Sequence, residues 1–301
     1  MQIFVKVIMG ISFMLFLVAC GGDAVDTAPQ KELSQAVVKT KTAETNTTKE
    51  ETNTTILPVP KPIVILPNQK IFLLGDSTTF NRSGQQVGWG NRFGDYMKNP
   101  ENFRNLARGG ASSRSYKDFD GWRDWRLTKK IILETNTTDG AYLLIQFGNN
   151  DIARNQQEAE NLNNKKTMPG RFNTYYTELK EYIDWARAHD IVPVLISPLQ
   201  AMNKGNNIPL QNIYKRPYGD YAETMRELAK DEDVLLIDLA RKSYDVFNSY
   251  TSRVEIINDF GVIGARDYTH FRSEGAYKVA GWAKDFICAS KDKTLCAQFK
   301  E

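Results

Sequence analysis

The stretch Ile71-Phe72-Leu73-Leu74-Gly75-Asp76-Ser77-Thr78 carries the clearest indication of the fold in this sequence. Four consecutive apolar residues are too few for a helix and indicate a strand buried on both faces, as in a parallel sheet. The glycine lets the backbone turn sharply, so the hydroxyl of Ser77 would lie at the carboxyl edge of the sheet. Open α/β sheets bind their ligands at that edge, which makes Ser77 a candidate nucleophile. Serine is also a common turn residue, and the stretch alone leaves that alternative open.

Apolar runs and amphipathic stretches alternate along the rest of the chain. Further strands are predicted at 141–147, 191–196 and 234–237, and helices at about 172–186, at about 218–230 and in a last segment capped by Ser273. This alternation predicts an α/β protein with a central parallel sheet covered by helices on both faces. Walls of a binding cleft are predicted from three weakly patterned stretches, at 153–170, 201–216 and 252–266.

The first 19 residues have the character of an export signal. Lys6 is the only charge among them, and the apolar run at 7–19 is short for a membrane span, which needs about 20 residues. Leu17-Val18-Ala19-Cys20-Gly21 resembles the lipobox of bacterial lipoproteins, which implies cleavage before Cys20 and a lipid on its thiol. The alternative is an ordinary secretory signal followed by an unrelated cysteine. We expect a signal peptide at 1–19 and a membrane-anchored protein of the bacterial cell envelope, either periplasmic or surface-exposed.

Residues 20–62 are predicted to be a disordered tether. The segment is rich in Thr, Lys, Glu, Asn and Pro, and it repeats Glu-Thr-Asn-Thr-Thr at 44–48 and 51–55. Such a composition offers too little apolar surface to offset the entropy lost on ordering the chain. The remaining residues, 63–301, are enough for one substantial globular domain.

The composition argues against several classes of partner. The formal net charge is +3 and becomes +2 once Lys6 is removed with the signal peptide. No basic stripe runs along the chain, so we expect no nucleic-acid partner. The chain has only two histidines, and neither its histidines nor its cysteines have the spacing of metal ligands. No phosphate-binding glycine loop is present either, and we therefore predict no metal site and no cofactor.

Two cysteines, Cys288 and Cys296, remain once Cys20 is lipidated. They flank a charged loop in a protein that leaves the cytosol, which predicts a disulfide between the last helix and the C-terminal tail. Two free thiols are the alternative.

The two histidines have different surroundings in the sequence. His189 follows the last turn of a predicted helix, where a cation is favoured by the helix dipole, and that position explains it without a catalytic role. His270 has Asp267 three residues before it, and in a tight turn the carboxylate can reach Nδ1 and leave Nε2 facing a serine. A hydroxyl nucleophile needs such a base, itself oriented by a carboxylate. A surface turn is the alternative interpretation of Asp-x-x-His alone.

Four short motifs resemble the signature blocks of the SGNH (GDSL-type) hydrolases and follow their order: Gly75-Asp76-Ser77, Asn105 with Gly110, Gly148-Asn149-Asn150-Asp151, and Asp267-Tyr268-Thr269-His270. Gly88-Trp89-Gly90 and Gly110-Ala111-Ser112-Ser113-Arg114-Ser115-Tyr116 further resemble the rhamnogalacturonan acetylesterase branch. The resemblance spans about 70–287 and implies a flavodoxin-like three-layer α/β/α fold. It also implies a nucleophile, base and orienter at Ser77, His270 and Asp267. The implied oxyanion hole consists of the amides of Ser77 and Gly110 and the side chain of Asn150.

The chain departs from that branch at two positions, and both bear on the sugar that it recognises. Asn149 stands where the branch commonly has histidine, and Ala111 stands where the second block commonly has arginine. Contacts with the substrate are expected from Asn149 and Ser112. Trp122 and Trp125 lie among charged residues and are predicted to form a cleft wall for a sugar ring, whereas Trp89 is predicted to lie in the core.

The expected function is therefore a serine esterase that removes O-acetyl groups from a polysaccharide or oligosaccharide. A lipase, lysophospholipase or thioesterase of the same superfamily is the alternative among enzymes. A surface glycan-binding lipoprotein on an inactive hydrolase fold is the alternative from another class, although the intact set of Ser77, Asp267 and His270 argues against it.

Overall fold

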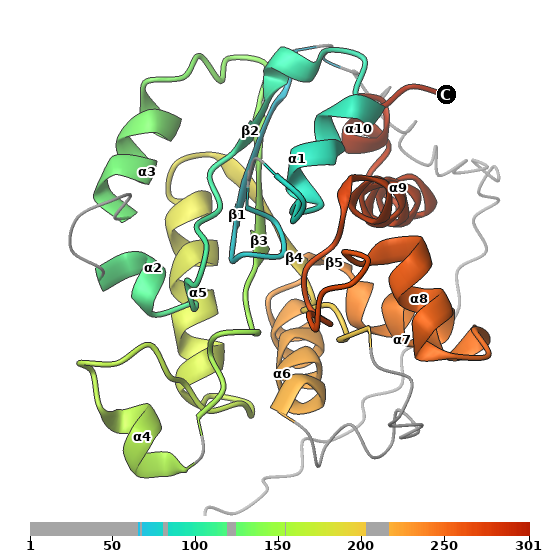
Figure 1. Ribbon diagram of the computed structural model, residues 1–301. Helices are drawn as coiled ribbons and strands as arrows, with labels where there is room; N and C mark the ends of the chain where they lie inside the picture. The colour runs from blue at the N-terminus through green and yellow to red at the C-terminus, as the bar shows by residue number, and fades with distance from the viewer. Residues whose placement is uncertain (1–65, 67, 81–83, 119–124, 154, 203–216) are drawn as a thin grey trace, which may run out of the picture. The chain divides into compact units, whose positions relative to one another are not determined.

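The computed structural model describes residues 66, 68–80, 84–118, 125–153, 155–202 and 217–301 (Figure 1). This part of the chain holds one sheet of five parallel strands: β1 (Lys70–Gly75), β2 (Phe103–Asn105), β3 (Ala141–Gln146), β4 (Ile191–Ile196) and β5 (Leu235–Ile237). Their order across the sheet is β2-β1-β3-β4-β5. That is the flavodoxin-like order, in which ligands bind where the chain reverses direction across the sheet, between β1 and β3.

The central strand β1 is buried on both faces because successive side chains point to opposite sides of a strand. Ile71 and Leu73 belong to one apolar core, and Phe72 and Leu74 belong to the other. None of the four has any exposed surface. Full burial of such a side chain contributes roughly 1.5–3 kcal/mol, so this short run anchors both layers of the fold.

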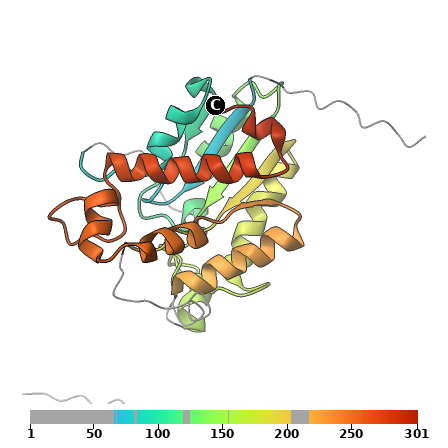
Figure 2. The ribbon, with the colours of Figure 1, turned by 90° about the vertical axis from the view of Figure 1, so that its right-hand side faces the viewer.

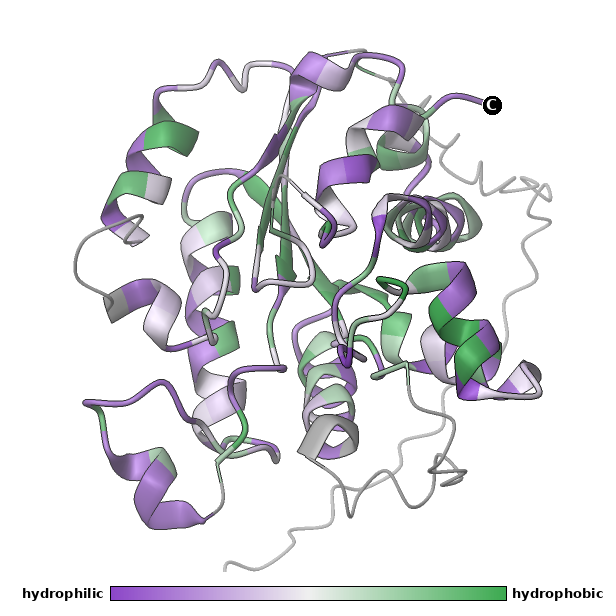
Figure 3. Cartoon of the chain, in the orientation of Figure 1, coloured by the Kyte–Doolittle hydropathy of each residue, from purple (hydrophilic) through white to green (hydrophobic). Residues whose placement is uncertain are grey.

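Helices cover both faces of the sheet, as expected for a three-layer fold. The side chains of one core come from α1 (Gly90–Phe93), α7 (Leu239–Ser249), α8 (Arg253–Phe260), α9 (Ser273–Ala289) and α10 (Lys293–Cys296). Those of the other core come from α2 (Ser115–Asp118), α3 (Trp125–Leu133), α5 (Thr174–Arg187) and α6 (Pro217–Asp231). Figure 2 shows α9 lying across the sheet, and Figure 3 shows the hydrophobic strands enclosed between helices with hydrophilic outer faces.

Three short elements complete the described chain. The single-turn helices η1 (Gly94–Tyr96) and η2 (Pro100–Asn102) lead into β2. Helix α4 (Gln156–Glu160) is capped by Asn155, whose side chain accepts a hydrogen bond from the Glu158 amide. In Figure 1, α4 lies apart from the sheet, beyond its carboxyl edge.

The predicted fold class and parallel sheet are confirmed, as are the four predicted strands and the helices that became α5, α6 and α9. One local prediction is wrong: Ser273 is the first residue of α9 and makes no capping hydrogen bond there. The stretch 252–266, predicted as a wall of a binding cleft, contains the helix α8. Strand β2 was not predicted, because two of its three residues are polar and they form no apolar run.

The disulfide is confirmed, since Cys288 near the end of α9 and Cys296 at the end of α10 are bonded, with their sulfurs 2.08 Å apart. The signal peptide, the lipobox with Cys20 and the whole predicted tether fall within 1–65, outside the described residues. Among the helices that the structure describes, none combines the length and apolar character needed to cross a membrane.

Candidate active site

The order of the strands brings three separate segments to one edge of the sheet. β1 lies between β2 and β3, and all three run parallel. The turn with Ser77 after β1 therefore lies between the segment after β2, which carries Gly110, and the turn after β3, which carries Asn150. β1 and β3 are paired along their whole length, up to Gly75 opposite Gln146, so their turns leave the sheet at the same level.

The turn after β1 is held in place by hydrogen bonds between buried polar groups. One carboxylate oxygen of Asp76 accepts hydrogen bonds from the amide and the hydroxyl of Thr78, both at 2.8 Å. Gln146 donates to the same hydroxyl at 2.9 Å and accepts from the indole of Trp89 at 2.7 Å. Burial raises the pKa of Asp76 despite the hydrogen bonds from Thr78. Trp89 is thus a core residue, as predicted.

Gly75 is required by close packing rather than by an unusual backbone conformation. Its φ is not positive, so the sharp turn does not depend on glycine at this residue. A Cβ there would instead overlap the Thr79 hydroxyl and lie 2.9 Å from the Gln146 carbonyl oxygen. Any larger residue would push the nucleophile turn away from β3.

His270 reaches Ser77 from the segment that precedes α9. The neighbouring residue Phe271 bridges to Val87, whose amide donates to the Phe271 carbonyl at 2.7 Å, and it also bridges to Gly261. Phe271 is fully buried, in the same apolar core as Ile71 and Leu73. The backbone around His270 is therefore fixed on two sides before its ring makes any contact.

Ser77, His270 and Asp267 form a continuous chain of hydrogen bonds. His270 Nε2 lies 2.9 Å from Ser77 Oγ, and His270 Nδ1 lies 2.8 Å from Asp267 Oδ2. Because a carboxylate only accepts hydrogen bonds, Nδ1 carries the proton and Nε2 is left to accept the serine hydroxyl. This is the arrangement that a hydroxyl nucleophile needs to lose its proton.

The carboxylate of Asp267 is saturated with donors. Oδ1 accepts from the amides of Thr269 and His270 at 2.9 and 3.1 Å, and Oδ2 also accepts from Gln86 Nε2 at 2.6 Å. Partial burial raises the pKa of Asp267, but the hydrogen bonds from Thr269 and His270 outweigh it and hold the pKa below its usual value. Asp267 therefore stays ionised and able to hold the imidazole.

The segments with the predicted oxyanion donors are joined to one another. Asn150 Nδ2 donates to the Ala111 carbonyl at 3.0 Å, which uses one of its two N–H groups and leaves the second for another acceptor. Gly110, next to Ala111, has φ +75°, a conformation that glycine adopts without strain. The joint action of Ser77, Gly110 and Asn150 on an oxyanion remains a prediction.

Of the predicted substrate contacts, Ser112 has a buried side chain and Asn149 has a buried side-chain nitrogen. Ser112 is fully buried, and its hydroxyl accepts from the Ser115 amide at 3.0 Å within the same turn. This position argues against the predicted contact of Ser112 with substrate. The side-chain nitrogen of Asn149 is buried and has no partner among the described residues, and its role stays a prediction.

Trp125 is placed differently from the prediction. Its ring packs edge-on against Tyr182 and Trp185 of α5, with ring centroids 4.9 and 4.8 Å apart. Trp125 therefore takes part in the packing between α3 and α5, which argues against the predicted cleft wall. Trp122 lies outside the described residues.

His189 lies on the surface, as the sequence indicated. Its Nδ1 lies 2.7 Å from the Trp185 carbonyl oxygen, and its ring stacks on that of Trp185. These contacts account for the residue without a catalytic role.

Three residues of the site were missed by the sequence reasoning. Gln86 holds the catalytic carboxylate, while Asp151 and Arg114 cross-link the segments around the oxyanion donors. Asp151 and Arg114 lie inside the motifs already quoted, so their nearness to the donors was a usable signal. Nothing near Gln86 in the sequence indicates a contact with a residue 181 positions away.

Comparison with known proteins shows the family of the chain. The model of the GDSL-like lipase/acylhydrolase family matches residues 71–283. The probable rhamnogalacturonan acetylesterase YesY of Bacillus subtilis (strain 168) is 33% identical over 213 residues, which are 70% of this chain and 88% of that protein. The rhamnogalacturonan acetylesterase RhgT of the same organism is 31% identical over 223 residues, 70% of this chain and 86% of that protein.

A solved structure also resembles the fold. The protein YXIM_BACsu from Bacillus subtilis superimposes with a TM-score of 0.56 at 22% identity, and the match covers 75% of this chain. The chain spans only 58% of the length of that protein. The likeness therefore concerns the fold.

Proposed function

Because the chain belongs to the GDSL-like lipase/acylhydrolase family, and is thus a carboxylic ester hydrolase, we propose that it removes O-acetyl groups from a polysaccharide or oligosaccharide. The observation that carries the proposal is the hydrogen-bonded chain from Ser77 through His270 to Asp267, in a protein about one-third identical to two named rhamnogalacturonan acetylesterases. The proposed substrate is an acetylated pectin-like polymer such as rhamnogalacturonan.

The proposed reaction begins with attack of Ser77 Oγ on the ester carbonyl carbon while His270 Nε2 takes the serine proton. Asp267 holds the resulting imidazolium, and the amides of Ser77 and Gly110 with Asn150 Nδ2 stabilise the oxyanion. Collapse of this intermediate expels the sugar hydroxyl, which receives the proton from His270 and leaves an acetyl group on Ser77. Water activated by His270 then releases acetate and regenerates the serine. One well-placed oxyanion donor is worth about 3–4 kcal/mol of barrier in such sites.

The preferred length of the acyl group distinguishes the proposed acetylesterase from a lipase of the same family. A pocket sized for a methyl group excludes longer chains, whereas a lipase gains about 0.8 kcal/mol for each methylene that it buries. We expect kcat/KM to fall from p-nitrophenyl acetate through butyrate to octanoate. An increase along that series would exclude the acetylesterase and favour a lipase or lysophospholipase.

The preference for a particular sugar is tested by measuring acetate release from acetylated polymers. Acetylated rhamnogalacturonan, acetylated xylan and a chemically acetylated neutral glucan are compared at equal acetyl content. We expect the first to be the best substrate, and to exceed p-nitrophenyl acetate in kcat/KM, since sugar contacts far from the ester can orient it. Equal rates on all three polymers would contradict the proposed sugar and leave the esterase.

We also propose that Cys20 carries a lipid that anchors the enzyme in the cell envelope. The support is the resemblance of 17–21 to a lipobox, directly after an apolar export signal. Wild-type protein should partition into the detergent phase, and the Cys20→Ser variant should be soluble or retain its signal peptide. Equal partitioning of the two proteins would contradict the anchor.

A further inference from the structure

Two of the predicted oxyanion donors, Gly110 and Asn150, lie on segments that are far apart in the chain. Gly110 lies between β2 and α2, and Asn150 lies 40 positions later in the turn after β3. Gly110 is exposed, and space is open around its Cα, so its own packing does not fix it. Donors that stabilise an oxyanion must already be in place when the charge develops. The hydrogen bond from Asn150 Nδ2 to the Ala111 carbonyl joins the two segments at one point, and further contacts would fix the backbone on either side of it.

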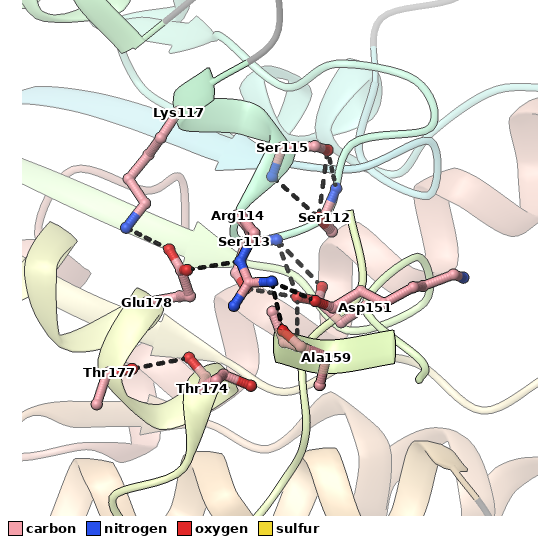
Figure 4. Close-up of polar contacts among 12 residues, drawn as sticks. Ser112, Ser113, Arg114, Ser115, Lys117, Asp151, Ala159, Thr174, Thr177 and Glu178 are labelled. Carbon is pink, nitrogen blue, oxygen red and sulfur yellow. Dashed lines mark hydrogen bonds and ion pairs between the residues drawn. The ribbon is translucent and has the colours of Figure 1, made fainter. Parts of the chain in front are cut away.

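The carboxylate of Asp151 lies between these segments (Figure 4). Asp151 follows Asn150 in the chain, and its two oxygens each lie 3.1 Å from the Ser113 amide nitrogen, which donates to them. Its Oδ1 also accepts from the hydroxyl of Ser113 and, at 2.9 Å, from that of Thr167. Asp151 has no exposed surface, so these contacts are shielded from water.

Arg114, the next residue in the chain after Ser113, anchors the same segment through further contacts (Figure 4). Its guanidinium is almost completely buried and donates to Glu178 of α5 at 2.9 Å. It also donates to the carbonyls of Ala159 and Lys166 at 2.6 and 2.8 Å. Arg114 thus fixes the segment to α5 and to the chain around α4, and Asp151 fixes it to the turn of Asn150.

We propose that Asp151 is the positioning residue of the oxyanion hole. Through its hydrogen bonds with Ser113, Asp151 holds the segment 110–113 against the turn that carries Asn150. The inference rests on the proposed esterase reaction. Asp151 touches neither substrate nor the reacting atoms, and it acts through the residues on either side of it. Sites of this kind need donors placed to within about 0.5 Å, which a buried carboxylate with several directed donors can provide.

The cost of burying this carboxyl supports a functional role. Desolvation raises the pKa of Asp151 to about 7 even though hydrogen bonds from Ser113 and Thr167 lower it, and the buried Asp76 nearby raises it further. A buried charge is often replaced by apolar packing without loss of stability. Its presence directly behind the donors is explained if it sets their positions.

The first test is Asp151→Asn, assayed on p-nitrophenyl acetate at pH 8, where the wild-type carboxyl is ionised. The new amide cannot accept from the Ser113 amide at both positions, so we expect kcat to fall about 10- to 100-fold while KM changes less than about twofold. The matched control is Asp292→Asn. Asp292 accepts from the amides of Thr294 and Leu295 at 3.1 and 2.9 Å, and it lies near the opposite edge of the sheet.

Melting temperatures separate a positioning role from a structural one. We expect both Asp→Asn variants to melt at lower temperature and only Asp151→Asn to lose turnover. Unchanged kcat in a folded Asp151→Asn protein would overturn the inference.

If Asp151→Asn does not fold, Ser113→Ala takes its place, since it deletes only the hydroxyl contact. We expect Ser113→Ala to lower kcat about 3- to 10-fold with KM unchanged. Wild-type kcat in that variant would equally overturn the inference. Ser77→Ala is measured alongside, because persistent activity there would refute the proposed esterase reaction itself.

Discussion

Two carboxylates serve the two halves of the candidate site, and their surroundings are opposite. Asp267, whose side chain is 19% exposed, lies at the rim and holds the His270 ring. Asp151 is fully buried behind the oxyanion segments. Hydrogen bonds overcome partial burial and lower the pKa of Asp267, whereas desolvation overcomes the hydrogen bonds and raises the pKa of Asp151 to about 7. The difference shows that exposure, more than the number of donors, decides which charge state each carboxyl prefers.

The largest loss of activity is expected when His270, the base that Asp267 orients, is removed. We expect His270→Ala to lower kcat by about 10⁴-fold or more, because the members of a triad act as a unit. His189→Ala is the internal control and should change kcat less than about twofold, as is usual for surface substitutions. Steady-state kinetics on p-nitrophenyl acetate measure both. A larger loss in His189→Ala would disprove the assignment of His270.

Replacing Asp267 itself tests the rim carboxylate. In Asp267→Asn the imidazole loses the acceptor that keeps the proton on Nδ1, so we expect kcat to fall by about 10³-fold, less than in His270→Ala. Circular dichroism should show a folded protein. If the variant retained more than a tenth of wild-type kcat, the ring would have to be oriented by some other group.

The opposite pKa shifts predict opposite effects of pH on stability. Since the folded-state pKa of Asp151, about 7, lies above its unfolded value of 3.8, the folded protein binds the extra proton between those values. Its contribution to the free energy of unfolding is therefore greatest below pH 3.8 and is lost as pH rises through 7, by at most about 1.4 kcal/mol per pH unit. Asp267, with a lowered pKa, contributes stability at neutral pH that is lost as pH falls below about 4.

Urea unfolding of wild type and Asp151→Asn from pH 4.5 to 8 measures the first of these effects. The difference in unfolding free energy should shift in favour of the variant as pH rises. A difference that stays constant over this range would show that Asp151 does not titrate there.

The smallest expected effect on activity comes from the aromatic packing behind the oxyanion half. Tyr182 donates to the Ser113 carbonyl at 2.7 Å, and Trp125 packs on the Tyr182 ring. We expect Trp125→Ala to lower the unfolding free energy by about 2–3 kcal/mol and to change kcat/KM for acetylated polymer less than about twofold. A selective loss on polymer with p-nitrophenyl acetate spared would restore the predicted role of Trp125 in binding sugar.

The sequence was sufficient for those features that depend on local patterns. The apolar run at 71–74 predicted a buried strand and the turn of Ser77, and Asp267 and His270 lie within one short turn whose spacing could be read directly. Contacts between distant segments were not predictable in this way. Gln86 donates a hydrogen bond to Asp267, which lies 181 positions later in the chain. Trp125 was predicted to line a cleft because its neighbours in the sequence are charged, but its ring packs on α5.

The hydrogen bond between Ser77 and His270 joins residues 193 positions apart. The nucleophile is therefore synthesised before its base, and β2, β3, β4 and β5 are made between the two. A chain that stops anywhere between them can contain a complete β1 and an intact serine turn but no base. Ester hydrolysis is thus a property that the polypeptide acquires only after β5 and the segment of His270 have been made, and its appearance reports that the turn after β1 and the segment before α9 have met.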